Sequence, residues 1–168
     1  QSRSSAASDV YKRQVLASLL MLVSCGFHLR GMNPSIRLLA TKWQVDKGTA
    51  LSLPIKKELR HLKGVEVVEE GGMARIEIKN MNFVREAQSM DRYGEVADYY
   101  YTLLVEVQVY YQNQPWGEPI RLMSERYLTY RADSLVVQEE EHLLQEEMLK
   151  DAAEALVNRL RYLPKPPR

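Results

Sequence analysis

Cysteine is almost absent from this chain of 168 residues, which contains one, Cys25. A single cysteine cannot form a disulfide within the chain, and it cannot supply the clustered thiolates of a structural zinc site. Histidine is also scarce. His28, His61 and His142 lie far apart, and no two of them have the spacing of metal ligands. The sequence therefore predicts no metal centre and no cofactor.

An excess of either charge is lacking as well. The chain carries 23 basic and 22 acidic side chains, a formal net charge of +1. General nucleic-acid binding needs a strong basic excess, so no nucleic-acid partner is expected. The apolar run Val15–Val23 is too short to span a bilayer, which takes ~20 apolar residues.

Recognisable catalytic motifs are missing too. Gly71-Gly72 stands alone and forms no phosphate-binding loop, and there is no Gly-x-Ser-x-Gly elbow. Glu139, Glu140 and Glu141 are consecutive, and consecutive helical positions point in different directions, which indicates a solvated acidic turn. The sequence favours a binding or assembly role over an enzyme.

What the chain does have is a short apolar segment that ends at its cysteine. Lys12 and Arg13 precede the run Val15–Val23, and residues 22–25 read Leu-Val-Ser-Cys. A basic flank, a brief apolar stretch and small residues at a cut site are typical of a secretory signal. The tetrapeptide resembles a bacterial lipobox, which predicts cleavage before Cys25 and a diacylglyceryl group on its sulfur. The alternative is a buried core cysteine after a truncated signal.

These features predict four parts of the chain. Residues 1–24 are expected to be a non-native leader followed by a lipoprotein signal peptide, and residues 25–35 a lipidated tether. Residues 36–163 are expected to form a single domain, and residues 164–168 a Pro-rich tail.

The domain shows both helical and strand periodicity. Helices are predicted over 51–63 and 134–163, strands over 36–43, 65–69, 74–90, 99–111 and 120–130, and a hairpin loop over 113–117. In the first helix Pro54 falls in the first turn and Lys56 on the outer face. The alternation in 74–90 slips near Asn80, which indicates a β-bulge. The order predicts an α+β fold: a mixed or antiparallel sheet of about four to five strands with two helices packed on one face.

The segment 99–111 has the clearest strand pattern. Its odd-numbered residues are apolar or aromatic, which predicts that this face packs under the helices. Tyr100, Tyr110 and Gln108 fall on the opposite face. That mixed aromatic and polar face suits contact with a polar partner, or it is a solvated face with incidental tyrosines.

Several of these residues resemble a known family. Residues 25–31 read Cys-Gly-Phe-His-Leu-Arg-Gly and resemble the mature start of the lipopolysaccharide-assembly lipoproteins, LptE. A helix that ends in Gly64-Val65, an Arg-x-Gly turn at 92–94 and a final helix with Ala-Ala-Glu-Ala-Leu at 152–156 are similar too. The resemblance implies a non-enzymatic, lipid-anchored protein on the periplasmic side of the outer membrane. It also implies that the protein plugs an LptD-type β-barrel as a heterodimer and binds lipopolysaccharide.

The resemblance also implies residues for lipopolysaccharide binding. Arg92 matches the basic residue of the family's Arg-x-Gly turn. A second basic residue, expected just before the last helix, falls near Val137 and Gln138, and Arg131 is the nearest cation. Two other functions stay open: a generic periplasmic lipoprotein that binds or regulates a cell-envelope enzyme, and a lipid-anchored hydrolase, which the missing motifs make the least favoured.

Overall fold

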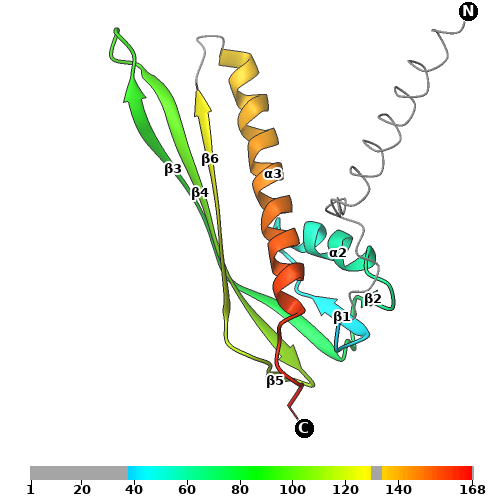
Figure 1. The fold of residues 1–168 in the computed structure, drawn as a ribbon. Helices are drawn as coiled ribbons and strands as arrows, with labels where there is room; N and C mark the ends of the chain where they lie inside the picture. The colour runs from blue at the N-terminus through cyan, green and yellow to red at the C-terminus, as the bar shows by residue number, and fades with distance from the viewer. Residues whose placement is uncertain (1–37, 130–133, 168) are drawn as a thin grey trace, which may run out of the picture. The chain divides into compact units, whose positions relative to one another are not determined.

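The computed structural model describes residues 38–129 and 134–167, within a compact unit that runs from Ser35 to Arg168. Two helices and six strands make up this unit (Figure 1). In chain order they are β1 (Lys42–Val45), α2 (Ser52–Arg60), β2 (Glu66–Val68), β3 (Ala74–Met90), β4 (Val96–Tyr111), β5 (Gln114–Pro115), β6 (Ile120–Thr129) and α3 (Ser134–Leu160).

The six strands form one mixed sheet, which confirms the α+β prediction. β1 lies between β2 and β3 and is parallel to both, whereas β3, β4 and β6 are long antiparallel neighbours. β5 adds a short antiparallel pair beside the end of β4. The sheet therefore has one strand more than expected, because β5 lies inside the segment predicted as a loop.

The connection after β4 differs from the prediction. Gln112 and Asn113 have φ angles of 48° and 66°, and they form the tight turn that returns the chain along β4. A two-residue hairpin turn with both central φ angles positive matches the natural twist of the strands, so pairing resumes at once. Gln114 and Pro115 are thus strand residues opposite Tyr111 and Tyr110 rather than part of a long loop.

The first strand also differs in its bounds. It runs from Lys42 to Val45 rather than over 36–43, because its parallel pairing places Trp43 opposite both Val67 and Ala74. Residues 36 and 37 lie outside the described part of the chain. The bulge predicted near Asn80 is confirmed, since the register of β3 on β4 shifts between Ile78 and Asn80.

The hydrophobic core lies between the sheet and the helices. The odd-numbered residues of β4 from Tyr101 to Val109 are buried, as the alternation predicted. They pack with buried residues of β1, α2 and α3, which include Trp43, Ile55, Leu59, Met148, Ala152, Leu156 and Leu160. The apolar sides of both helices therefore cover one face of the sheet.

Two side chains predicted to face solvent are buried instead. Gln108 is 7% exposed, because the chain between β5 and β6 lies over it, and its Nε2 donates to the carbonyl oxygens of Val109 at 2.9 Å and Gly117 at 3.2 Å. Lys56 of α2 is also buried, and its Nζ donates to Glu69 Oε1 at 2.7 Å. Each buried polar group has a partner, which offsets the cost of removing it from water.

Candidate functional site

The predicted site residues fall in three places. Arg92 lies in the turn between β3 and β4, at the far end of the long hairpin (Figure 1). Cys25 and Arg131 lie outside the described residues, as does His28. Arg92 is therefore the one predicted site residue that the described part of the chain places.

The backbone around Arg92 is held in a defined turn by Asp91. Oδ1 of Asp91 accepts hydrogen bonds from the backbone amides of Tyr93 at 2.8 Å and Glu95 at 2.9 Å. The amide of Asp91 donates to the carbonyl of Glu95 at 2.7 Å, and Gly94 takes the positive φ of 80° that closes the turn. The Asp91 carboxylate thus satisfies two backbone amides of the turn, and the Arg92 side chain extends from a hydrogen-bonded backbone.

The guanidinium of Arg92 is exposed at this tip. Its Cζ lies 4.8 Å from the centre of the Tyr93 ring, a cation–π contact. Within the described residues, no carboxylate lies within ion-pair distance of Arg92, so the pairing with Asp91 or Glu95 that a solvated turn arginine would make is not seen. A planar cation that keeps its donors available suits a phosphate oxyanion.

Below the tip, the sheet face turned away from the helices carries exposed apolar and aromatic side chains. Leu104, Met123 and Tyr127 are 43%, 64% and 56% exposed. The register places Leu104 opposite Met123 and Tyr100 opposite Tyr127. We call these four residues the outer-face patch. Clustered exposed apolar side chains in a folded domain indicate an interaction surface.

Each tyrosine of the outer-face patch has a carboxyl group beside its hydroxyl. Tyr127 bonds to Asp98 and Tyr100 to Glu125, and these bonds raise the pKa of both phenols. Ser89 Oγ also donates to Asp98, and that bond is the main cause that lowers the pKa of the Asp98 carboxyl. The outer-face patch therefore combines aromatic rings with carboxyl groups beside their hydroxyls.

Sequence reasoning found only part of this surface. It placed Tyr100 on the outer face from the alternation in β4, but it did not identify Met123 or Tyr127. The signal was present in β6, where Ile120, Leu122 and Leu128 mark the inner face and leave Met123 and Tyr127 on the other. Cross-strand pairing with β4 is what makes these residues one patch.

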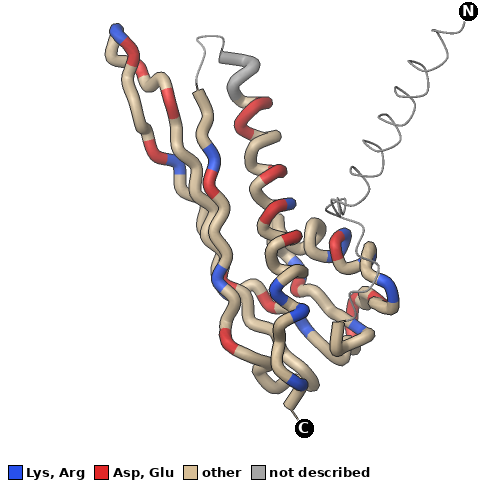
Figure 2. The backbone as a smooth tube through the Cα atoms, in the orientation of Figure 1, with Lys and Arg blue, Asp and Glu red and all other residues tan. Residues whose placement is uncertain are grey.

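Charged groups border the patch toward the base of the sheet. Arg75 Cζ lies 4.6 Å and Lys79 Nζ 5.5 Å from the centre of the Tyr110 ring. Lys79 also bonds to Glu77 at 2.6 Å, which lowers the pKa of that carboxyl. Figure 2 shows acidic residues repeated along α3, on the opposite side of the sheet. The outer face is therefore apolar in its middle and cationic near Tyr110.

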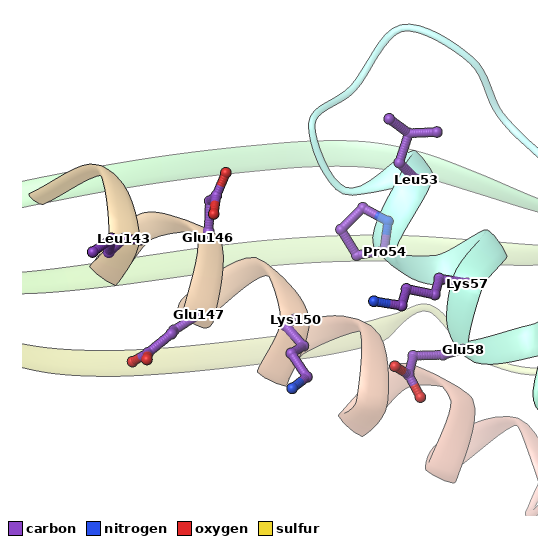
Figure 3. A pocket seen from close by; sticks show the side chains of 8 residues that line it. All are labelled: Leu53, Pro54, Lys57, Glu58, Leu143, Glu146, Glu147 and Lys150. Atoms are coloured by element: carbon purple, nitrogen blue, oxygen red, sulfur yellow. The ribbon is translucent and has the colours of Figure 1, made fainter. Parts of the chain in front are cut away.

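A groove of about 460 Å³ lies between α2 and α3 (Figure 3). Its apolar lining comes from Leu53, Pro54 and Leu143, and charged side chains of both helices border it: Lys57, Glu58, Glu146, Glu147 and Lys150. The charged residues lie along an open strip rather than around an enclosed centre. Nothing in this arrangement brings a nucleophile and a base together.

The described residues offer no site for a metal ion. This part of the chain contains no group of three or more His, Cys, Asp or Glu side chains placed to hold a metal ion. His142 pairs with Glu146 one helical turn away at 3.7 Å and is exposed. His61 is exposed at the end of α2. Neither of the helices in the described part is both long and apolar enough to cross a membrane.

Solved structures share this fold. A minor lipoprotein from Acinetobacter baumannii matches with a TM-score of 0.65 and 19% identity, over 79% of this chain and 100% of that one. Rare lipoprotein B from Shewanella oneidensis matches with a TM-score of 0.62 and 20% identity, over 73% and 95% of the two chains. Lipoprotein B from Nitrosomonas europaea matches with a TM-score of 0.60 and 22% identity, over 81% and 88%.

No curated protein sequence matches the chain. A family model does match, that of LptE, described as lipopolysaccharide-assembly, and it covers residues 40–160. That range takes in both helices and all six strands of the sheet. The chain therefore belongs to the LptE family of lipopolysaccharide-assembly proteins.

Proposed function

We propose that this chain is a lipid-anchored assembly protein that plugs an LptD-type β-barrel in the outer membrane and binds lipopolysaccharide on its way to the cell surface. Family membership supports an assembly role in general. The outer-face patch supports the barrel contact, because the side chains of Leu104 and Met123 are exposed next to each other on neighbouring strands.

A barrel wall is a suitable partner for this surface. The lumen of a large outer-membrane barrel is polar and wet, and a plug that contacts it needs aromatic rings and polar groups together rather than a purely apolar face. Tyr100 and Tyr127 supply such rings, with their hydroxyls bonded to Glu125 and Asp98. The apolar centre of the patch, Leu104 and Met123, then supplies the desolvated contact that dominates affinity.

Lipopolysaccharide binding is assigned to the hairpin tip. Arg92 stands on a turn whose backbone Asp91 holds in place, and the Arg92 guanidinium keeps its donors available. Arg131, near the start of α3 in the sequence, is proposed as a second cation for the same ligand. Both would pair with the phosphorylated, anionic part of lipopolysaccharide.

Attachment to the outer membrane is assigned to Cys25. Its lipobox-like setting suits a lipid anchor on the periplasmic side. One acyl chain gives only marginal membrane binding, at ~0.8 kcal/mol per buried CH₂, so durable attachment needs at least two chains. We therefore propose that Cys25 carries a diacylglyceryl group and an added fatty acid, such as palmitate.

The barrel contact is tested with a matched pair of charge substitutions. Leu104→Asp places a carboxylate in the outer-face patch, and Leu53→Asp places one at an exposed position on α2. Each variant is coexpressed with the barrel and purified from detergent-solubilised outer membranes. We expect Leu104→Asp to weaken the complex by roughly tenfold or more, the usual effect at a central interface residue, and Leu53→Asp to leave it intact.

The opposite result would separate this proposal from its alternative. Equal recovery of the barrel with both variants would show that the outer face does not contact it. Recovery of a cell-envelope enzyme, with no barrel, would instead identify the chain as a lipoprotein that binds or regulates such an enzyme.

A further inference from the structure

The long strands leave two open sides to the sheet, one along β6 and one along β3. In an antiparallel pair, the N–H and C=O groups of successive residues point alternately toward the partner and away from it. The amide of Trp116 donates to Val109 O at 2.7 Å, so the odd-numbered residues of β4 direct these groups toward β5 and β6. The register then directs the groups of Asn82 and Val84 toward β4, and those of Met81 and Phe83 away from it.

The bulge near Asn80 shifts this alternation by one residue. The part of β3 before the bulge has the opposite phase. Before the bulge, Ile76 pairs with Val109, and its carbonyl accepts from the amide of Asp46 at 2.9 Å, outside the β3–β4 ladder. Beyond the bulge, the outward positions become the odd-numbered ones, among them Met81, Phe83 and Ala87.

Arginine side chains cap the β6 edge. Arg159 of α3 donates from Nη1 to the carbonyl of Arg121 at 2.5 Å, and Arg126 donates from Nη1 to the carbonyl of Glu125 at 2.8 Å. Arg121 and Glu125 are odd-numbered residues of β6, which the register directs away from β4. A carbonyl that already accepts from an arginine, with the guanidinium beside it, is less available to the N–H group of another strand, so these two positions disfavour pairing at this edge.

The β3 edge has no matching protection among the described residues. On the side away from β4, no strand of the described chain pairs with β3 beyond Ile76. Met81 and Phe83 are half-buried beside the core, and Ala87 is exposed. Between the register shifts after Ile78 and after Ala87, the segment Asn80–Ala87 is regular. Eight such residues extend for roughly 27 Å, enough for a further strand of ordinary length.

From this asymmetry we infer that the β3 edge, Asn80–Ala87, is a docking site for an extended segment of the barrel partner, which adds as a strand to the sheet. The inference rests on the proposed barrel complex. The occupant is an extended chain because only another backbone matches a row of N–H and C=O groups at every second residue. The barrel partner is its source because the edge borders the same sheet face as the outer-face patch, with Asn82 opposite Leu104.

The side chains along the β3 edge also determine which side chains the docked segment of the barrel needs. On the inner face of the sheet, the docked segment lies beside Met81 and Phe83 and completes the burial of their side chains. Its side chains on that face are therefore apolar. On the outer side it lies beside the exposed carboxylate of Glu86, where a basic residue pairs best. The segment therefore alternates apolar with polar residues, with a cation at one outward position.

Amide hydrogen exchange, read residue by residue on the purified chain with and without the detergent-solubilised barrel, tests the inference. In the free chain, the amides of Asn82 and Val84 should exchange slowly, and those of Phe83 and Ala87 quickly. In the complex, Phe83 and Ala87 should become protected by at least roughly tenfold, while the amide of Arg121, which lies on the β6 edge and outside the outer-face patch, changes less. A complex that forms without protection of Phe83 and Ala87 would overturn the inference and leave the barrel proposal standing. Failure to form any complex would overturn both.

A pair of substitutions gives an independent readout. Ala87→Pro removes the outward N–H, whereas Ala87→Ser keeps it and changes the side chain little. We expect Ala87→Pro to weaken the complex by roughly fivefold or more, because an edge hydrogen bond is lost and the ring blocks the incoming strand, and Ala87→Ser to bind like the unmodified chain. Melting temperatures establish that both variants fold. Equal affinities of the two variants would contradict strand addition.

Discussion

At the scale of single residues, the structure separates side chains that hold the fold from those that remain available to a partner. The Asp91 carboxylate accepts hydrogen bonds from backbone amides of the β3–β4 turn, and the Arg92 side chain is exposed at its tip. Leu104 and Val105 are neighbours in the sequence, yet Leu104 faces outward and Val105 is buried. Residues of these two kinds should respond differently to substitution.

Arg92→Glu should weaken lipopolysaccharide binding by roughly tenfold or more, because a charge-assisted bond to phosphate of ~1.5–3 kcal/mol is replaced by repulsion. The fold should be unaffected, since the side chain is exposed. The measurement is a binding titration at matched salt, with Arg161→Glu, an exposed arginine after α3, as the control. Equal affinities of the two variants would remove the hairpin tip from the site.

Val105→Asp should lower the free energy of unfolding by several kcal/mol, because it places an unpaired charge in the core. Leu104→Asp should cost far less, since its side chain already reaches water. Gln108→Asp should also destabilise the fold, because Gln108 is buried and its Nε2 donates to the carbonyls of Val109 and Gly117. Comparable melting temperatures for the Val105 and Leu104 variants would mean that the two faces of β4 are reversed.

At the scale of elements, α2 contacts the sheet through its apolar face and through the ion pair between Lys56 and Glu69. Lys56 Nζ lies 2.7 Å from Glu69 Oε1, and Lys47 Nζ lies 3.3 Å from Glu69 Oε2. The hydrogen bond from Lys56 is the largest cause that lowers the pKa of the Glu69 carboxyl below its usual 4.5. Glu69, just after β2, therefore joins α2 to the segment that follows β1.

This pair gives the fold a pH dependence with a defined sign. A carboxyl whose pKa is lower in the folded chain stabilises it above the unfolded pKa, near 4.5, and loses that contribution as pH falls through the folded pKa. Chemical denaturation at pH 7 and at pH 3 should therefore show a loss of stability that Glu69→Gln reduces. Glu70→Gln, at the adjacent exposed position, should keep the full loss. An identical loss in both variants would exclude Glu69 as a contributor.

At the scale of the whole molecule, local patterns predicted the fold class, both helices, the long strands and the bulge at Asn80. They did so because alternation and helical spacing are properties of neighbouring residues. The parallel pairing of β1, the short β5 and the burial of Gln108 and Lys56 depend on segments distant in sequence, such as Gly117 and Glu69. The outer-face patch likewise arises only when β4 and β6 are in register.

The proposed lipid anchor on Cys25 also concerns the whole protein, because it would determine the compartment in which the domain works. Mass spectrometry of the mature chain should find Cys25 as the first residue, with its mass raised by a diacylglyceryl group and an N-linked fatty acid. A Cys25→Ala variant should be released from the membrane fraction. An unmodified thiol on Cys25 of the mature chain would contradict the lipid anchor.

If this chain plugs an LptD-type β-barrel, the two proteins form a stable complex. The most direct test is affinity purification of the full-length protein from detergent-solubilised outer membranes, followed by native mass spectrometry of what it retains. We expect one abundant species that contains one copy of this chain and one copy of a large barrel. Recovery of this chain without the barrel, from membranes in which the barrel is present, would show that the chain is not a barrel plug.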